Sequence, residues 1–197
     1  MVLETTVDFL SENVLPAAED YEAAERALSD AVQVDATPSH WVEAGRLAKR
    51  RSAELAIAID SLTDRAATEL SHSKSNIRKM VSALCFWPGG SELREGCIER
   101  VRAAANAYKH QHLSDPSLPI SSDKDVLVVG VGYGLDGYGV GKLGGIEVIL
   151  KDASGQQWKF LGDALVAIYA WLKFLHAWGG GVRVGNYKLF EVAFSIP

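Results

Sequence analysis

Cysteine is scarce in this chain of 197 residues, which contains only Cys85 and Cys97. Two thiols are too few for the disulfide framework that holds small secreted domains together, and no CxxC or zinc-binding spacing is present. A chain of this length buries enough apolar surface to fold around one core without disulfides or metals. We therefore expect both cysteines to be reduced and buried.

An excess of positive charge is also missing. Lys and Arg number 20 against 25 Asp and Glu, which gives a formal net charge of −5. Proteins that coat DNA or long RNA neutralise many phosphates with Lys and Arg, so this balance argues against a coating surface. It leaves room for a small basic cleft.

A segment long enough to cross a membrane is not evident either. Met1 to Glu4 lack the cationic start of a signal peptide. The most apolar stretch, residues 164–178, is shorter than the about 20 residues that span a bilayer, and it contains Lys173 and His176. The expectation is a cytoplasmic protein that does not associate with membranes.

Several common catalytic and ligand-binding motifs are missing. The sequence has no HExxH and no GxSxG, and Gly141-Lys142 is followed by Leu143, where a P-loop needs Ser or Thr. His110 and His112 are two residues apart, a spacing that directs them to different faces of a helix. We predict no metal site and no cofactor. His40, His72 and His176 are expected to be solvent-facing or packed.

A glycine-rich segment, residues 130–145, contains a GxGxxG pattern at 132–137 but precedes a strand, whereas a dinucleotide site needs a helix start. A hairpin loop is the simplest interpretation. Long glycine loops sometimes close over sites, so we retain a small-molecule site as a secondary hypothesis. Its candidate contacts are Tyr133, Tyr138 and Lys142.

Apolar residues recur at steps of three and four over most of the first half of the chain, which predicts helices. Residues 5–33 are predicted as two helical pieces that meet at Pro16. Thr37 is expected to cap a long helix that starts at Pro38 and ends near Ser71. Further helices are predicted over residues 75–86 and, capped by Ser91, over residues 92–113.

The pattern changes in the second half, where β-branched residues cluster at 126–129 and 146–150 and a turn precedes 158–160. The prediction is a mainly α single domain: a helical bundle of four to six helices with a small antiparallel sheet inserted before the last long helix. The predicted domain has helices within residues 5–113, a β insertion at 124–160, a last helix at 163–177 and a strand-like tail at 182–197. Three glycines follow the last helix and terminate it.

One polar constellation is unusual. Arg102, Asn106 and His110 follow one another at steps of four, so they form a row along one side of the predicted helix. The row offers a permanent cation, an amide and an imidazole that exchanges a proton near neutral pH. Cleavage of RNA without a metal needs such groups, a general acid or base at the 2′-hydroxyl and a cation beside the phosphate. A structural role for the row, with Arg102 paired to a nearby glutamate, is the alternative.

The Asn106-Ala-Tyr-Lys-His110 segment, with the helices before it and the aromatic-rich last helix, resembles the HEPN group of helical bundle proteins. Many members are metal-independent ribonucleases that act as dimers in prokaryotic defence or toxin–antitoxin systems. The resemblance implies catalytic roles for Arg102, Asn106 and His110, and RNA or partner contacts for Lys109 and His112. Seven residues separate Arg102 from His110, whereas active members have four to six.

That departure leaves a second interpretation open, in which the protein is a non-catalytic relative that binds a partner or forms a homodimer. Its alanine-rich helix, residues 103–107, would serve dimerisation. Trp171, Phe174 and Trp178 would form a surface for packing or for a protein partner.

Overall fold

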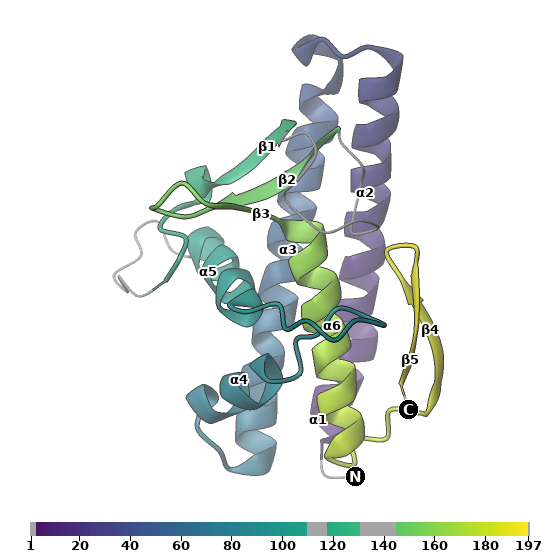
Figure 1. Ribbon diagram of the computed structural model, residues 1–197, viewed down its shortest axis with the longest axis vertical. Helices are drawn as coiled ribbons and strands as arrows, with labels where there is room; N and C mark the ends of the chain where they lie inside the picture. The colour runs from purple at the N-terminus through teal and green to yellow at the C-terminus, as the bar shows by residue number, and fades with distance from the viewer. Residues whose placement is uncertain (1–2, 110–117, 131–144, 197) are drawn as a thin grey trace.

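The computed structural model describes residues 3–109, 118–130 and 145–196, and it is mainly helical, as predicted. Two long helices, α2 (Leu15–Val34) and α3 (Pro38–Leu70), run antiparallel and form the spine of the molecule (Figure 1). The last helix, α6 (Phe160–Ala177), packs beside them. The shorter α4 (Lys74–Ser82) and α5 (Cys97–Lys109) cover α3 on one side.

The N-terminal helical run changes its winding just before Pro16. Helix α1 (Glu4–Phe9) passes through a π-helical turn, Leu10–Val14, into α2. Proline has no N–H, so it cannot donate to the carbonyl four residues earlier, and the widened turn absorbs that missing bond. The predicted junction near Pro16 is confirmed, but the two pieces are joined without a break.

Helix α3 begins at Pro38 and ends at Leu70, as the sequence predicts. Its predicted apolar stripe, which includes Leu55, Ile59 and Leu62, is buried. The expected cap is wrong: the Thr37 hydroxyl lies 3.2 Å from the Ser39 hydroxyl and bonds no free amide at the helix start.

The boundaries of α4 and α5 differ from the prediction. Helix α4 ends at Ser82, four residues before Phe86, and α5 starts at Cys97, so Ser91 caps no helix. Phe86 instead forms an antiparallel bridge with Leu93, and the Arg94 N–H donates to the Cys85 carbonyl at 2.7 Å. These long-range bonds occupy backbone groups that a helix would need.

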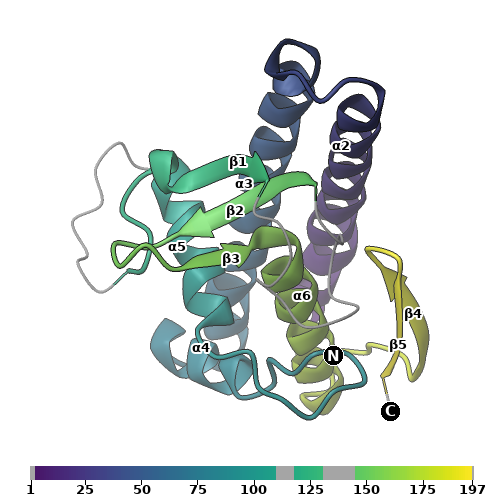
Figure 2. The same ribbon diagram turned by 45° about the horizontal axis from the view of Figure 1, so that its top comes forward.

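The inserted sheet is confirmed. Strands β1 (Val126–Gly130), β2 (Ile146–Lys151) and β3 (Gln157–Lys159) are antiparallel, with β2 in the centre (Figure 2). Val148 and Leu150 join the helical core, so the sheet lies across α2 and α3. Phe160, expected as the end of the third strand, starts α6 instead.

Helix α6 is the centre of the core. It is long and apolar enough to cross a membrane by length and composition, but 78% of it is buried inside the fold, which fits the core helix of a soluble protein. The predicted glycine stop is confirmed, since Gly179 and Gly181 have positive φ and the Gly180 N–H donates to the Leu175 carbonyl at 2.7 Å.

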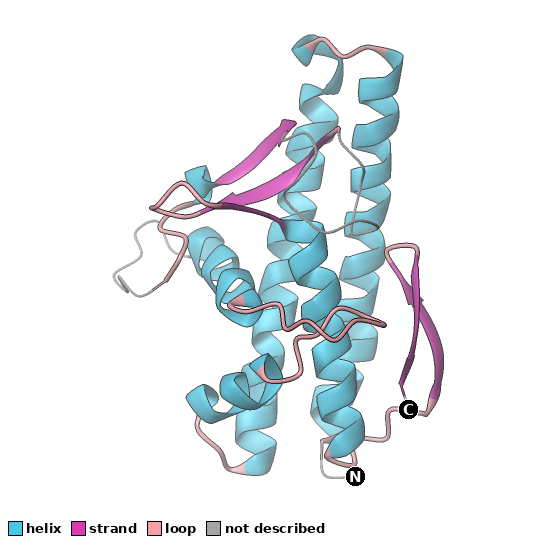
Figure 3. Cartoon of the chain, in the orientation of Figure 1, coloured by secondary structure: helices cyan, strands magenta, loops and turns pink. Residues whose placement is uncertain are grey.

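The C-terminal tail forms a hairpin of its own, β4 (Gly185–Leu189) and β5 (Val192–Ile196), where the sequence indicated a loose strand. This hairpin is separate from the inserted sheet and lies beside α2 and α6, on the far side of α6 from α5 (Figure 3).

Candidate functional site

The alanines of α5 let this helix approach its neighbours closely. Ala103, Ala104, Ala105 and Ala107 are buried, and α5 packs between α3 and α6. Small side chains permit a short distance between helix axes. The alanine-rich face is therefore covered by the chain itself, and the predicted use of this face for dimerisation is wrong.

The polar row occupies the remaining side of α5. Arg102 and Asn106 are half-buried, one helical turn apart, between neighbours that are covered. Lys109 follows three residues after Asn106 and seven after Arg102, so it lies on the same side and extends the row. The Asn106 side chain makes no hydrogen bond to any described residue. Its amide is available to a ligand.

Two residues from other helices join this row. Asp60 of α3 lies 3.3 Å from the Lys109 ammonium and 3.9 Å from the Arg78 guanidinium of α4. Near the start of α5, the Ser82 hydroxyl donates to Glu99 at 3.5 Å. The polar side of α5 therefore faces polar groups of α3 and α4, with the cations Arg78 and Lys109 on either side of Asp60.

Sequence reasoning missed Asp60 and Arg78. A signal for Asp60 was present, because it is the only charged residue between Glu54 and Asp64, in an otherwise apolar part of the helix. A lone carboxylate in such a stretch needs a partner when it is buried. Arg78 carried no comparable signal.

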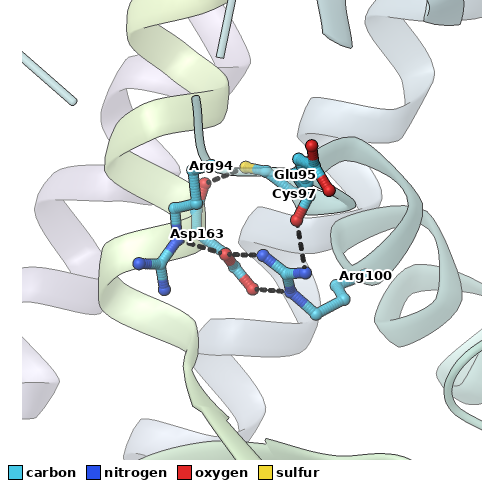
Figure 4. A network of polar contacts seen from close by, with 5 residues as sticks. All are labelled: Arg94, Glu95, Cys97, Arg100 and Asp163. Atoms are coloured by element: carbon cyan, nitrogen blue, oxygen red, sulfur yellow. Dashed lines mark hydrogen bonds and ion pairs between the residues drawn. The ribbon is translucent and has the colours of Figure 1, made fainter. Parts of the chain in front are cut away.

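A buried ion-pair network fixes the start of α5 against α6 (Figure 4). Both oxygens of Asp163 accept hydrogen bonds from Arg100, at 2.7 Å each, and one also accepts from Arg94 at 2.6 Å. Arg100 further donates to the Glu95 carbonyl at 2.8 Å and covers the Trp158 ring at 4.7 Å. This network positions the helix that carries the polar row.

The guanidinium of Arg100 stays charged in this environment. Burial lowers its pKa, but the hydrogen bonds and the charge of Asp163 outweigh burial, and the net effect is a raised pKa. Arg100 therefore remains a fixed structural cation, which distinguishes it from the more exposed Arg102.

The two cysteines are reduced and buried, as predicted. The Cys97 thiol donates to the Asp163 carbonyl at 3.2 Å and thereby belongs to the same network. Burial raises the pKa of Cys97, and contacts with Cys85 and the Asp163 carboxylate raise it further. A thiol kept protonated in this way is a poor nucleophile.

The other predicted residues divide into three groups. His40 and His72 are exposed, and His176 packs with its Nδ1 2.9 Å from the Val182 carbonyl, in line with the prediction.

Trp171 and Phe174 belong to the core and only Trp178 is exposed, so the predicted aromatic surface is wrong. The following lie outside the described residues: His110, His112, Tyr133, Tyr138, Lys142 and the GxGxxG segment.

Within the described parts of the chain, no three His, Cys, Asp or Glu side chains gather in a way that could hold a metal ion. No family model, no curated protein and no solved structure matches the chain.

Proposed function

We propose that the protein is a HEPN-like endoribonuclease that cleaves RNA by acid–base chemistry at the row of Arg102, Asn106 and His110. One observation carries this proposal: Arg102 and Asn106 remain half-exposed, one turn apart, on a helix whose alanine side is locked into the core. Catalytic side chains must be held in position by rigid, packed structure, and the buried side of α5 supplies such a support for these two residues.

The chemistry would follow from the three side chains. His110 would take the proton from the ribose 2′-hydroxyl, whose oxygen then attacks the adjacent phosphorus. The bond to the 5′-oxygen breaks, that oxygen takes up a proton from water, and a 2′,3′-cyclic phosphate and a 5′-hydroxyl result; the proton on His110 then returns to the solvent. Arg102 would stabilise the negative charge that develops on the phosphate. Asn106 would orient the reacting groups through its amide.

Lys109 is the neighbouring contact for RNA in this proposal. Asp60 holds its ammonium at 3.3 Å, which limits the freedom of a long side chain. An RNA strand that crosses the row would meet Lys109 with the phosphate next to the cleaved one. His112 is the second contact that the family resemblance suggests.

A homodimer is part of the proposal, because active HEPN proteins bring two copies of their catalytic helix together. The alanine face of α5 is covered by its own chain, so a second copy would have to approach from the polar row. Two rows that face each other would enclose one RNA strand, in the manner of enzymes that serve prokaryotic defence or toxin–antitoxin systems.

The test is degradation of a single-stranded RNA, with a metal chelator present, by the wild type and by variants over a range of protein concentrations. We expect His110→Ala and Arg102→Gln to lose about a hundredfold or more of the activity. Arg46→Gln is the matched control, since Arg46 is an exposed α3 arginine whose side chain is 71% accessible.

The concentration series tests the dimer, because specific activity should rise with protein concentration if two copies form the site. If the wild type and His110→Ala show equal, negligible activity, the ribonuclease proposal is wrong. The alternative of a non-catalytic interaction module would then be favoured.

A further inference from the structure

The C-terminal hairpin touches the helical body at two places and leaves a hollow between them. At its tip, Phe190 packs edge-on against Tyr21 of α2, with ring centroids 6.1 Å apart. Nearer its end, Phe194 packs edge-on against Tyr169 of α6 at 4.9 Å. The hairpin therefore arches over the groove between α2 and α6, and a cavity of about 240 Å³ lies beneath it.

This hollow is partly open to solvent, so it is a surface pocket and not a void inside the core. Close packing leaves few gaps larger than one water molecule, so the hairpin is not packed flat against the helices here. A water occupies about 30 Å³ in the liquid, so the hollow has room for several waters or for a small organic molecule. The hairpin that forms one wall of this hollow is anchored by the burial of Phe190, and Glu191 accepts from Arg26 at 3.2 Å at the surface.

The floor and the mouth of the cavity differ in chemistry. Leu15 of α2 and Ile168 and Leu172 of α6 form an apolar floor. Among the lining residues, the carboxylates are Glu19, Glu22 and Glu191, and the only cation is Lys188.

Two of these carboxylates are already neutralised by protein cations. Glu22 and Glu191 share Arg26, at 3.0 and 3.2 Å, and Lys188 also pairs with Glu191. Glu19 forms no ion pair with any described residue. Among the described residues, no cation pairs with this exposed carboxylate, which lines the pocket beside its apolar floor.

We propose that this cavity binds a small amphipathic cation, a primary amine with a short apolar chain. The chain would displace water from the floor formed by Leu15, Ile168 and Leu172, and the ammonium would pair with Glu19. A carboxylate of the same length would meet the same floor but would be repelled by the acidic mouth. The site lies across α6 from the polar row, so the inference does not depend on RNA cleavage.

The experiment is a titration of the full chain with hexylamine and with hexanoate, followed by calorimetry or by chemical shifts in NMR spectra. We expect saturable binding of one hexylamine and at least about tenfold weaker binding of hexanoate, because the two probes have apolar chains of similar length and head groups of opposite charge. Glu19→Gln should remove most of this preference. Glu12→Gln is the matched control, an exposed glutamate of the preceding turn that does not line the cavity.

A second variant tests the location of the site. Leu15 is half-buried, so Leu15→Phe can fill the hollow with little disturbance of the core, and an unchanged far-UV circular dichroism spectrum checks the fold. Hexylamine affinity should fall about fivefold or more in this variant. The proposal is overturned if the wild type shows no saturable binding, if both probes bind equally, or if hexylamine binds Leu15→Phe as well as it binds the wild type.

Discussion

Asp163 is a charged residue in the core of the protein. Its side chain is fully buried and receives hydrogen bonds from two guanidinium groups. Removing charges from water costs several kcal/mol for each ion, and only close, well-satisfied pairing offsets that cost. The arrangement is therefore far more sensitive to the loss of one partner than any pair on the surface.

We predict that Asp163→Asn lowers the free energy of unfolding by about 3–5 kcal/mol, because it removes the carboxylate that pairs with the buried Arg100 guanidinium and that also accepts from Arg94. Urea denaturation measures the change. Glu54→Gln, which breaks the exposed pair with Arg51, is the control and should cost less than about 1 kcal/mol. Equal effects of the two substitutions would contradict the role given to Asp163.

For single residues, the sequence predicted the features that depend on spacing along one helix. The row of Arg102 and Asn106 follows from a step of four on a helix, and both side chains are indeed half-exposed on one side. The contacts of Asp163 with Arg94 and Arg100 could not be predicted, because the partners are separated by 69 and 63 residues. Spacing along a helix says nothing about which distant segment packs against it.

At the scale of elements, the start of α1 is held by a residue of another helix. Glu69, in the last turn of α3, accepts from the Thr5 and Thr6 N–H groups at 2.9 and 3.0 Å and from the Thr6 hydroxyl. These amides belong to the first turn of α1, where helices have free donors. Partial burial raises the pKa of Glu69, but the hydrogen bonds from Thr6 and Thr5 outweigh it, so the pKa is lowered.

A lowered pKa means that folding favours the carboxylate form of Glu69. Its stabilising effect is present above the usual glutamate pKa of about 4.3 and is lost as the pH falls through the lower value of the folded state. We predict that Glu69→Gln is less stable than the wild type at pH 7, and that this difference shrinks below about pH 4.3. Thermal unfolding from pH 7 to pH 3 measures it, and a difference that stays constant would contradict the mechanism.

The tip of the C-terminal hairpin is strained. Phe190 and Glu191 have φ angles of 49° and 62°, in the left-handed region that favours glycine. The burial of Phe190 against Tyr21 offsets the strain at the first position, whereas Glu191 has only exposed ion pairs.

We predict that Glu191→Gly is more stable than Glu191→Ala by about 1 kcal/mol, because both variants lose the ion pairs and only glycine relieves the strain. Chemical denaturation of the two variants checks this. If the Glu191→Ala variant is as stable as the Glu191→Gly variant, the backbone of the turn is not strained as its φ angles indicate.

Element types proved easier to predict than element ends. The start of α3 carries its own signal in Pro38, and the end of α6 is followed by glycines, and both of these boundaries were predicted. The ends of α4 and α5 depend on the bridge between Phe86 and Leu93, which forms only when the chain folds back on itself. Local propensity favoured helix there, and tertiary pairing overrode it.

At the scale of the whole molecule, the hydrophobic core does not extend along the full length of α2 and α3. The far ends of α2 and α3 project beyond the inserted sheet (Figure 1). Residues 29–44 include no buried side chain, and the first buried position after them is Gly45. A Cβ at Gly45 would lie 3.1 Å from Val128 Cγ1, so this glycine allows β1 to pack directly on α3. Gly45 thus marks the boundary between the packed body and the projecting tip.

This distribution predicts two levels of local stability within one chain. A helix that buries little apolar surface opens at low cost, whereas α6 is surrounded by the core and should open only when the whole molecule unfolds. Amide hydrogens in residues 29–44 should therefore exchange much faster than those of α6, with opening free energies of at most a few kcal/mol against the full free energy of unfolding. Hydrogen exchange followed by mass spectrometry measures both segments in one digest. Equal protection would show that another surface covers the tip in solution, and exchange that slows with protein concentration would identify that surface as a second copy of the chain.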